Sequence, residues 1–494
     1  MAATVDVAII GAGFSGIGAA VALSDAGIDD FLLIEEGDGV GGAWHWNRYP
    51  GIGVDIPSFS YQFSFRQRPD WSRVYAPGSE LKDYADDCVD HYGLRPKLRL
   101  STRVTGASWD EDESVWRLET HAGDPVVARH VIGATGVLTK PQAPDIPGVG
   151  DFAGATMHTA RWDDSIDLRG KRVALIGTGA SAVQVVPSIA PDVEQLTVFQ
   201  RTPIWCLPKL DGPVPERVRR VLRSVPGAQQ TARFVSQALV ELTFPVAAHY
   251  ATVVPIANAS MKVALRHLDK QVRDPEVRDK LTPRYGLGCK RPGFSNDYLR
   301  TYNRPNVHLE TSPISAISGT SILTADGAHG PFDVLILATG FKVFEPGNMP
   351  PFPMRGAGGT DLEEFWATNR YQAYQGVSVP GFPNFFMILG PYGYNGASYF
   401  TLIENQSRHI VRCLKRAREI GATRVEVTRE ANDRFLEQML GRRHRQVFFQ
   451  GTCGTANSYY FDAHGDAPFR ASTTLEARWT SSRFPLADYR FSPQ

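Results

Sequence analysis

The chain has 494 residues, too many for one ordinary hydrophobic core, and a length of about 150 residues per domain favours two or three domains. Its 52 basic and 52 acidic residues balance, so no global field favours nucleic acid or an anionic membrane, and we expect a small-molecule partner. Five cysteines without a CxxC pair argue against a disulfide scaffold, a thiol redox centre and a zinc or other metal site.

The N-terminal segment predicts a Rossmann-type unit. Strand Val5–Ile10 enters the turn Gly11-Ala12-Gly13-Phe14-Ser15-Gly16, a helix follows, and a second strand ends at Glu35. In this context Gly11, Gly13 and Gly16 allow a tight turn, close approach to a pyrophosphate, and close packing of helix on strand. Because a carboxylate accepts hydrogen bonds from ribose hydroxyls, Glu35 indicates an unphosphorylated adenosine ribose, as in FAD.

A second unit repeats the first in register. Strand Val173–Ile176 enters Gly177-Thr178-Gly179-Ala180-Ser181-Ala182, and the unit ends at Arg201. The interval from the first glycine to the terminal charged residue is 24 residues in both units. Gly177, Gly179 and Ala182 take the three turn positions. Because a guanidinium pairs bidentately with a phosphate, Arg201 predicts NADPH instead of NADH.

Two further strands end alike, in Gly133-Ala134-Thr135-Gly136 and in Leu337-Ala338-Thr339-Gly340. Small residues at a strand end let the backbone pass close to a cofactor or cross between domains. The alternative for each is an ordinary strand end. Because each of these two strand ends follows a nucleotide unit, we expect the chain to cross between domains there.

Neither a secretory leader nor a transmembrane helix is expected. Met1 runs directly into the strand Val5–Ile10, which favours a cytoplasmic protein. The most apolar region, about 234–265, is interrupted by Glu241, His249 and two prolines, too often for a helix that spans a bilayer. We interpret this region as helix that is either buried or docked on a surface.

The segment between the two units resembles a family fingerprint. Phe152-Ala153-Gly154-Ala155-Thr156-Met157-His158-Thr159-Ala160-Arg161-Trp162-Asp163 is similar to the Baeyer-Villiger monooxygenase pattern F-x-G-x-x-x-H-x-x-x-W followed by Pro or Asp. A histidine among apolar neighbours is more often structural, but the flanking Phe, Gly and Trp favour the family. The resemblance extends over nearly the whole chain and includes Gly41-Gly42-Ala43-Trp44, Arg48-Tyr49-Pro50-Gly51, Asp55, Phe199-Gln200-Arg201-Thr202-Pro203, Lys290-Arg291-Pro292 and the tail from Tyr459 to Arg490.

The resemblance implies an α/β fold with two Rossmann-like dinucleotide-binding domains, for FAD and NADPH, and a helical insertion in the NADPH domain. The FAD domain would comprise residues 1–145 and 341–494. The NADPH domain would comprise residues 146–207 and 286–340, and the insertion residues 208–285.

The resemblance also implies an activity. An NADPH-consuming flavoprotein of this family inserts one oxygen atom of O2 next to a ketone carbonyl, through a C4a-peroxyflavin, to give an ester or lactone. Arginine stays protonated and offers directional donors for developing negative charge. Arg291 matches the family's catalytic arginine and Asp55 its carboxylate partner; the alternative is a surface ion pair of little worth. His158 would couple domain motion to catalysis.

The remaining site residues are assigned on the same basis. Lys290, Arg201 and Thr202 would clamp the 2′-phosphate of NADPH, or would form a solvated basic patch. Gly42, Trp44 and Tyr49 belong to the flavin-side stretch, and the two aromatic residues would either cover the flavin or fill core.

The sequence says less about the roles of residues 389–396 and of the run that holds Glu404 and Gln406. Residues 389–396 would pass near the flavin ring, but their aromatic residues depart from the family pattern, which leaves the ketone open. Glu404 and Gln406 are expected to be exposed or packing residues.

The two-nucleotide plan is shared by proteins with other functions. A flavin monooxygenase that oxidises soft sulfur or nitrogen nucleophiles is the nearest alternative, and a flavin-binding redox sensor is the non-enzymatic one. A dithiol-disulfide reductase shares the two-nucleotide plan but needs the missing CxxC pair. The expected partners are O2 and a ketone, without nucleic acid, for a protein that is a monomer or homodimer.

Overall fold

The computed structural model describes residues 3–254, 256–451, 453, 456 and 458–493. The first nucleotide unit consists of β1 (Ala3–Ile10), α1 (Phe14–Asp25) and β2 (Phe31–Ile34), which confirms the strand, helix and strand predicted there. β1 pairs in parallel with β2 on one side and with β6 (Val126–Gly133) on the other. Its last four residues are buried, as expected for a central parallel strand covered on both faces.

The first sheet draws on both halves of the chain. Its strand order is β17-β4-β5-β6-β1-β2-β3, and β18 also pairs with β6. The additional strands are β3 (Leu98–Arg99), β4 (Val104–Asp110), β5 (Val115–Thr120), β17 (Met354–Arg355) and β18 (Phe385–Met387). Because β17 and β18 join strands from the first 133 residues, this sheet is completed only after the chain has passed through the second unit.

The second sheet is entirely parallel. Its order is β12-β9-β8-β16-β7, and α4 (Ala180–Ile189) follows β8 as predicted. The strands are β7 (Ala155–His158), β8 (Arg172–Ile176), β9 (Gln195–Phe199), β12 (Val307–Glu310) and β16 (Val334–Leu337). A small antiparallel sheet, β13 (Ile314–Ser318), β14 (Ser321–Thr324) and β15 (Gly327–His329), lies beside it.

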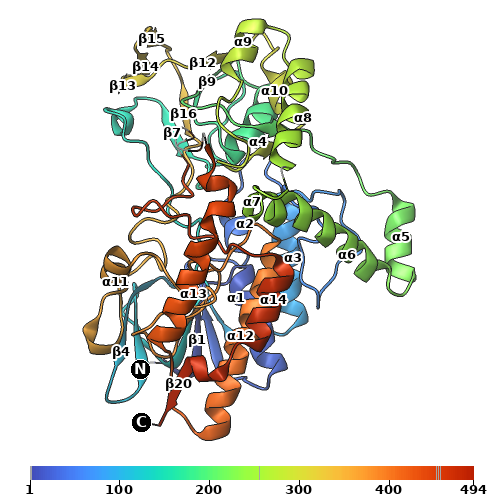
Figure 1. Cartoon of the computed structure of the whole chain (residues 1–494). Coiled ribbons are helices and arrows are strands. Elements are labelled where there is room, and N and C mark those ends of the chain that lie inside the picture. Colours follow the sequence, from blue (N-terminus) through green and yellow to red (C-terminus); the bar gives the residue numbers. More distant parts are fainter. Residues whose placement is uncertain (1–2, 255, 452, 454–455, 457, 494) are drawn as a thin grey trace.

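Figure 1 shows the two sheets at opposite ends of the molecule, with the second unit at the top and both chain termini at the bottom. The predicted fold class, α/β with two Rossmann-like units, is confirmed by this arrangement. The domain boundaries at 146, 208, 286 and 341 stay a prediction.

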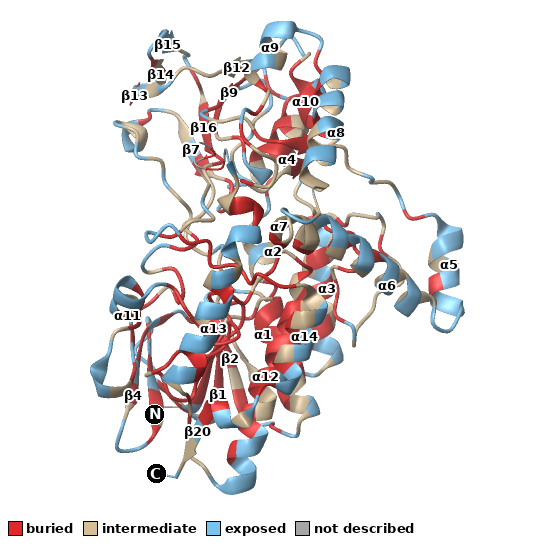
Figure 2. Ribbon diagram, in the orientation of Figure 1, coloured by how far each residue is buried: buried red, intermediate tan, exposed pale blue. Residues whose placement is uncertain are grey.

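A helical segment lies between two short strands, β10 (Cys206–Leu207) and β11 (Gly293–Phe294), which pair in parallel. Its helices are α5 (Glu216–Ser224), α6 (Ala228–Glu241), the π-helix η3 (Leu242–Val246), α7 (Ala247–His249), α8 (Ile256–Gln271) and α9 (Pro275–Lys280). Several large apolar side chains of α6 are exposed, so of the two interpretations for residues 234–265 the buried one is wrong for α6 (Figure 2). Within the described ranges, no helix has the length and apolar content needed to cross a bilayer.

Helices from the C-terminal part cover the first sheet. α12 (Tyr399–Ile420) packs on α1, and the contact requires glycine at position 18, since a Cβ there would lie 2.5 Å from the Ile403 side chain. The other elements are α2 (Ala43–Trp46), α3 (Gly78–His91), α10 (Tyr298–Thr301), α11 (Leu362–Asn369), α13 (Arg429–Arg442), α14 (Thr474–Arg483), β19 (Arg424–Val427) and β20 (Tyr489–Ser492).

Glu404 and Gln406 on α12 are buried, which confirms packing and excludes the exposed alternative. Glu404 accepts hydrogen bonds from the amide and hydroxyl of Ser64, both at 2.7 Å. Gln406 accepts from the amide of Leu389 at 2.7 Å and donates to the carbonyl of Gly393 at 2.9 Å. Gln406 therefore fixes the backbone of the 389–396 segment.

Candidate active site

The two glycine turns have the geometry of anion sites. α1 and α4 begin after Gly13 and Gly179, and no side chain among the described residues caps either helix. The first-turn amides of both helices are therefore available to a ligand, and the helix dipole favours a negative one. At Gly179 an added Cβ would meet no described atom within 4 Å, so the protein alone does not require glycine there. A closely approaching pyrophosphate does require it, and the turn fits a dinucleotide.

The repeated strand ends meet the turns in the same way. A Cβ on Gly11 would lie 2.6 Å from the carbonyl oxygen of Ala134, and a Cβ on Gly177 would lie 2.3 Å from that of Ala338. Both glycines also have positive φ, +107° and +124°. Each Ala-Thr-Gly strand end therefore packs against the first glycine of its unit. A side chain at that glycine is excluded both by the close carbonyl oxygen and by the positive φ.

The charged residues that end the two units differ in their surroundings. Glu35 is buried and accepts hydrogen bonds from the amides of Ala12 at 2.7 Å and Gly37 at 2.8 Å, so its carboxylate is fixed beside the first turn. Arg201 is exposed at the end of β9, close to Lys290. Burial, and then the charge of Arg201, lower the pKa of the Lys290 ammonium. Two cations held close together in this way suit a dianionic phosphate.

Thr202 is tied to the second turn, because the Thr178 hydroxyl donates to its carbonyl at 2.8 Å. The three residues predicted to bind the 2′-phosphate are thus brought to one end of the second sheet by β9 and by the loop that precedes β11.

The structure also brings Arg291 and Asp55 together across 236 residues. The guanidinium donates from Nε at 2.9 Å and from one terminal nitrogen at 2.7 Å to both carboxylate oxygens. Burial by itself lowers the pKa of Arg291, but Asp55 and three neighbouring phenols outweigh it, so the net pKa lies well above the usual arginine value. The guanidinium is therefore a permanent, oriented positive charge between the flavin-side loop and the second unit.

Tyrosines around Arg291 were missed by the sequence analysis. The Tyr394 phenol lies close enough to Arg291 for the guanidinium charge to act on it, and its ring stacks on Tyr399 with centroids 4.8 Å apart. Burial raises the pKa of both phenols, and both side chains keep some accessible surface. The rest of this cluster is Tyr61, Tyr459 and Tyr460. The only signal in the sequence was the unusual aromatic content of segment 389–396.

The flavin-side stretch joins the two units. Tyr49 is buried in the core of the second unit and donates from its hydroxyl to Gln184 of α4 at 3.0 Å. Gly42 lies against Gly13, where a Cβ on Gly42 would be 3.0 Å from the Gly13 Cα. Trp44 lies edge-on to Tyr61 at 5.8 Å, on the side of the Arg291 cluster. Contact of Trp44 and Tyr49 with a flavin stays a prediction.

His158 lies where the chain crosses between the units. The Ala160 amide donates to Nδ1 at 3.0 Å, so in the neutral ring Nε2 carries the proton and donates to the Thr339 hydroxyl at 3.3 Å. The two crossing segments run side by side there, with the Gln142 amide donating to the Gly340 carbonyl at 2.8 Å. Burial, followed by the charge of Arg161, lowers the pKa of His158 to about 4. The ring is therefore neutral near pH 7.

His158→Ala is expected to slow turnover about tenfold and to retain bound FAD, because one hydrogen bond across the crossing is lost while the glycine turns stay intact. The ring's contribution is fully present above its unfolded pKa of about 6.5 and is lost as pH falls toward 4. Turnover of wild type should therefore be flat from pH 8 to about 5 and should decline as pH falls through about 4, a decline that the variant lacks. Loss of flavin from the purified variant would instead mark His158 as purely structural.

A disulfide joins Cys289 to Cys453, 164 residues apart in sequence. The cysteine count argued against a disulfide scaffold, and it gave no sign of this single bond because the two positions are too distant for spacing to relate them. Cys289 immediately precedes Lys290 and Arg291, so the bond ties the arginine loop to the C-terminal part of the chain.

Cys453→Ser is expected to lower the midpoint of thermal inactivation by several degrees, since a disulfide that closes a long loop stabilises by about 2–4 kcal/mol. Turnover should fall with it, because the Arg291 loop is released. Wild type pretreated with dithiothreitol should behave like the variant, and the variant should not respond to the reductant. Equal inactivation curves for all four samples would show that the bond carries no stability.

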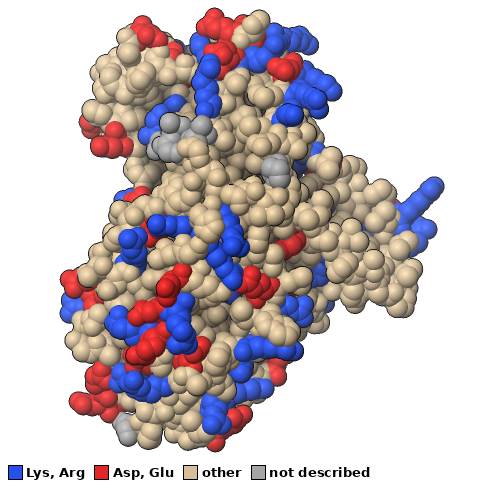
Figure 3. Space-filling model, in the orientation of Figure 1, with Lys and Arg blue, Asp and Glu red and all other residues tan. Residues whose placement is uncertain are grey.

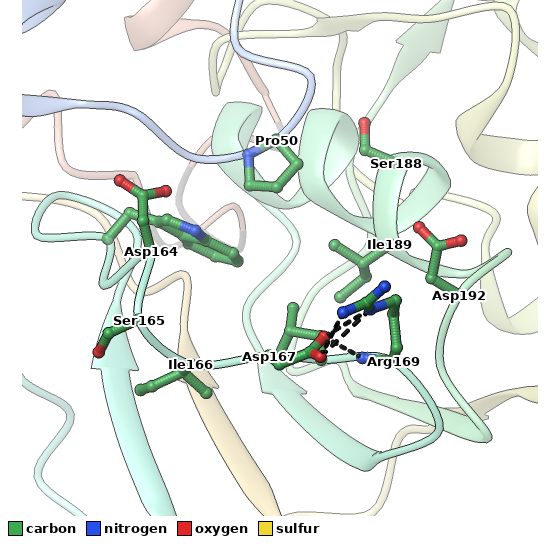
Figure 4. A pocket seen from close by; sticks show the side chains of 11 residues that line it. Pro50, Asp164, Ser165, Ile166, Asp167, Arg169, Ser188, Ile189 and Asp192 are labelled. Atoms are coloured by element: carbon green, nitrogen blue, oxygen red, sulfur yellow. Dashed lines mark hydrogen bonds and ion pairs between the residues drawn. The ribbon is translucent and has the colours of Figure 1, made fainter.

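An open pocket of about 440 Å³ lies apart from these residues (Figure 4). It is bordered by Pro50, by the 162–169 segment and by the end of α4. Arg169 at its rim pairs with Asp167 at 2.8 Å. None of the predicted site residues lines it, so it is not a candidate for the ketone site.

Comparisons with known proteins agree with this geometry. The family model described as pyridine nucleotide-disulphide oxidoreductase matches residues 8–211. A Baeyer-Villiger monooxygenase of Streptomyces coelicolor is 37% identical, over 98% of this chain and 92% of that protein. The structure of an oxidised steroid monooxygenase bound to NADP matches with a TM-score of 0.88 and 29% identity over 100% of both chains. An OTEMO structure in complex with FAD and NADP matches with a TM-score of 0.87 and 29% identity over 99% of both chains.

Fold and site together define a flavoprotein oxidoreductase with two dinucleotide-binding units. Within that class, the chain belongs to the Baeyer-Villiger monooxygenases, as the fingerprint predicted. It is an NADPH-dependent flavoprotein monooxygenase, and the redox-sensor alternative is wrong. The reductase-type family model reflects the shared nucleotide-binding plan, since the sequence has no CxxC pair.

Proposed function

We propose that this monooxygenase takes one oxygen atom from O2 and inserts it next to the carbonyl of a ketone, giving an ester or lactone, at a site centred on Arg291. The observation that supports the ketone reaction is the Arg291–Asp55 pair, a partly buried positive charge held by a bidentate carboxylate. The pair lies between the flavin-side loop and the second nucleotide unit, with tyrosines on its open side.

The two glycine turns would hold the cofactors. The amides at the start of α1, with Glu35 on the ribose, would bind FAD; those at the start of α4, with Arg201, Thr202 and Lys290 on the 2′-phosphate, would bind NADPH. Bound FAD would supply oxygen activation with electrons from NADPH. Everything else in the reaction depends on how the chain orients the ketone and stabilises its charge.

Arg291 would donate hydrogen bonds to the ketone oxygen as negative charge develops there. Its net raised pKa means that it stabilises this charge without giving up a proton. Asp55 would keep the guanidinium plane aimed at the reacting carbonyl. The raised phenol pKa of Tyr394 keeps that side chain neutral, so it adds a hydrogen bond without adding charge.

The assignment of residues 1–145 and 341–494 to FAD, of 146–207 and 286–340 to NADPH, and of 208–285 to an insertion belongs to this proposal. So do a cytoplasmic location and a monomeric or homodimeric state.

Product analysis tests the proposal directly. Purified protein with bound FAD, NADPH and air-saturated buffer is given linear, cyclic and aromatic ketones and one thioether, and products are identified by mass spectrometry. We expect ester or lactone in near-stoichiometric ratio to NADPH consumed for at least one ketone. Sulfoxide as the only oxygenated product would assign the chain to soft-nucleophile oxidation, and hydrogen peroxide alone from every substrate would contradict oxygen insertion.

A further inference from the structure

The helical arm formed by α5 and α6 has its apolar face turned to solvent. Figures 1 and 2 show this arm projecting from the side of the molecule, with α5 outermost. On α6 the exposed residues recur at helical spacing, and Phe234 and Val235 are 74% and 62% exposed. Leu239 and Leu242 continue the same stripe. A helix at the surface of a protein normally shows the reverse orientation.

The polar face of α6 is turned inward, where Arg233 and Gln237 contact the body of the protein. Arg233 donates to the carbonyl of Gln62 and lies 3.6 Å from the carboxylate of Glu404, with both side chains about one-tenth exposed. Gln237 donates to the Thr401 hydroxyl at 2.9 Å. These contacts fix the rotation of the helix, so the outward apolar stripe is not an accident of a loosely attached segment.

α5 adds a basic amphipathic turn to the same arm. Val218, Val221 and Val225 form an exposed apolar stripe, and four arginines (Arg217, Arg219, Arg220 and Arg223) occupy the rest of the helix surface. Glu216 pairs with Arg219 at 3.2 Å and with Arg223 at 3.3 Å, which leaves a local excess of positive charge. Figure 3 shows blue basic side chains at the outer end of the arm.

α14 begins beside the end of α6 and carries further exposed apolar side chains. The amide of its first residue, Thr474, donates a hydrogen bond at 2.8 Å to the carboxylate of Glu241 at the end of α6. Leu475 and Trp479, one helical turn apart, are 75% and 58% exposed. Arg483 lies over the Trp479 ring at 3.7 Å, so arginine again borders an exposed apolar side chain.

We propose that the α5–α6 arm, with Leu475 and Trp479, docks this enzyme onto an anionic phospholipid surface. Apolar side chains bordered by arginine are the composition of helices that lie in a bilayer interface, where the side chains enter the acyl boundary and the guanidinium groups meet lipid phosphates. Tryptophan favours the same zone because its ring has an apolar body and a polar edge.

A second copy of the chain fits this face less well. Symmetric pairing of α5 with α5 would bring the four arginines of one copy near those of the other, and like charges at an interface are unfavourable. The total of 52 basic and 52 acidic residues gives no sign of this surface, because the excess of positive charge is confined to the short helix α5.

Co-sedimentation of the FAD-loaded enzyme with vesicles tests the docking. We expect binding to vesicles of phosphatidylglycerol and phosphatidylcholine, little binding to phosphatidylcholine alone, and release as NaCl is raised. The double variant Phe234→Glu/Leu239→Glu and the double variant Arg217→Glu/Arg220→Glu should each lose about tenfold or more in binding. Ile420→Glu, an exposed apolar position at the end of α12, is the matched control and should bind like wild type.

Turnover with a small water-soluble ketone should be unchanged in all three variants, which separates docking from catalysis and verifies that they fold. Wild type that stays in the supernatant with both kinds of vesicle overturns the proposal, as does equal binding to both kinds. A dimer in light scattering that Phe234→Glu/Leu239→Glu dissociates would assign the face to a second copy instead.

Discussion

In the Arg291→Ala variant, NADPH is expected to reduce the bound flavin at the wild-type rate, whereas ester should form about 10²–10³-fold more slowly than in wild type. This is the range found when a charge-stabilising donor is removed from an active site. The reason is local. Arg291 is the positive group within the tyrosine cluster, and alanine leaves no charged donor for the negative charge that develops on the ketone oxygen. Anaerobic flavin bleaching measures reduction, and ester release under air measures oxygenation.

Two controls make this result specific. Removing Arg291 leaves Asp55 partly buried without its partner, which is itself destabilising, so the double variant Arg291→Ala/Asp55→Asn should recover thermal stability without recovering oxygenation. Arg284→Ala removes an exposed arginine from the same segment and should leave both half-reactions unchanged. Full ester production by Arg291→Ala would remove Arg291 from the chemistry.

The nucleotide units could be predicted because their signals are local. In each, a strand, a glycine turn, a helix and a terminal charge follow one another within about 30 residues, the length of one βαβ unit, so spacing alone fixes the geometry. The sequence indicated that the strand ends at Ala134 and Ala338 lie near a cofactor or a domain crossing, but it did not indicate what they contact. Only the fold shows that each carbonyl meets the first glycine of its unit.

The reacting centre could not be derived from spacing. Asp55 and Arg291 are 236 residues apart, and their pairing followed from the family resemblance. The tyrosine cluster joins Tyr61 to residues near 394 and 460, and the disulfide joins Cys289 to Cys453. Such long-range contacts depend on how the two sheets and the C-terminal helices assemble, and no single stretch of sequence encodes them.

The sequence also does not predict which face of an amphipathic helix is turned inward. The apolar period of α6 predicts a stripe on one face, and burial of that stripe is the ordinary expectation. The structure turns it outward because Arg233 and Gln237 on the opposite face find partners in the body of the protein. Periodicity specifies which residues share a face, but the partners decide which face is inside.

Arg201→Asp is expected to reduce the preference for NADPH over NADH by about 100-fold, measured as the ratio of kcat/KM values for flavin reduction. A hydrogen bond to a charged group contributes about 1.5–3 kcal/mol, and every 1.4 kcal/mol is a factor of ten, so losing the guanidinium and placing a carboxylate beside the 2′-phosphate accounts for this change. The new carboxylate would also place at position 201 the kind of ribose ligand that we propose for Glu35 in the first unit. Lys290→Ala is the matched comparison: it removes one cation of the pair without adding a negative charge, and its effect on the ratio should be smaller. An unchanged ratio in Arg201→Asp would place the 2′-phosphate elsewhere, and the charge reversal between the two units would then have no role in cofactor choice.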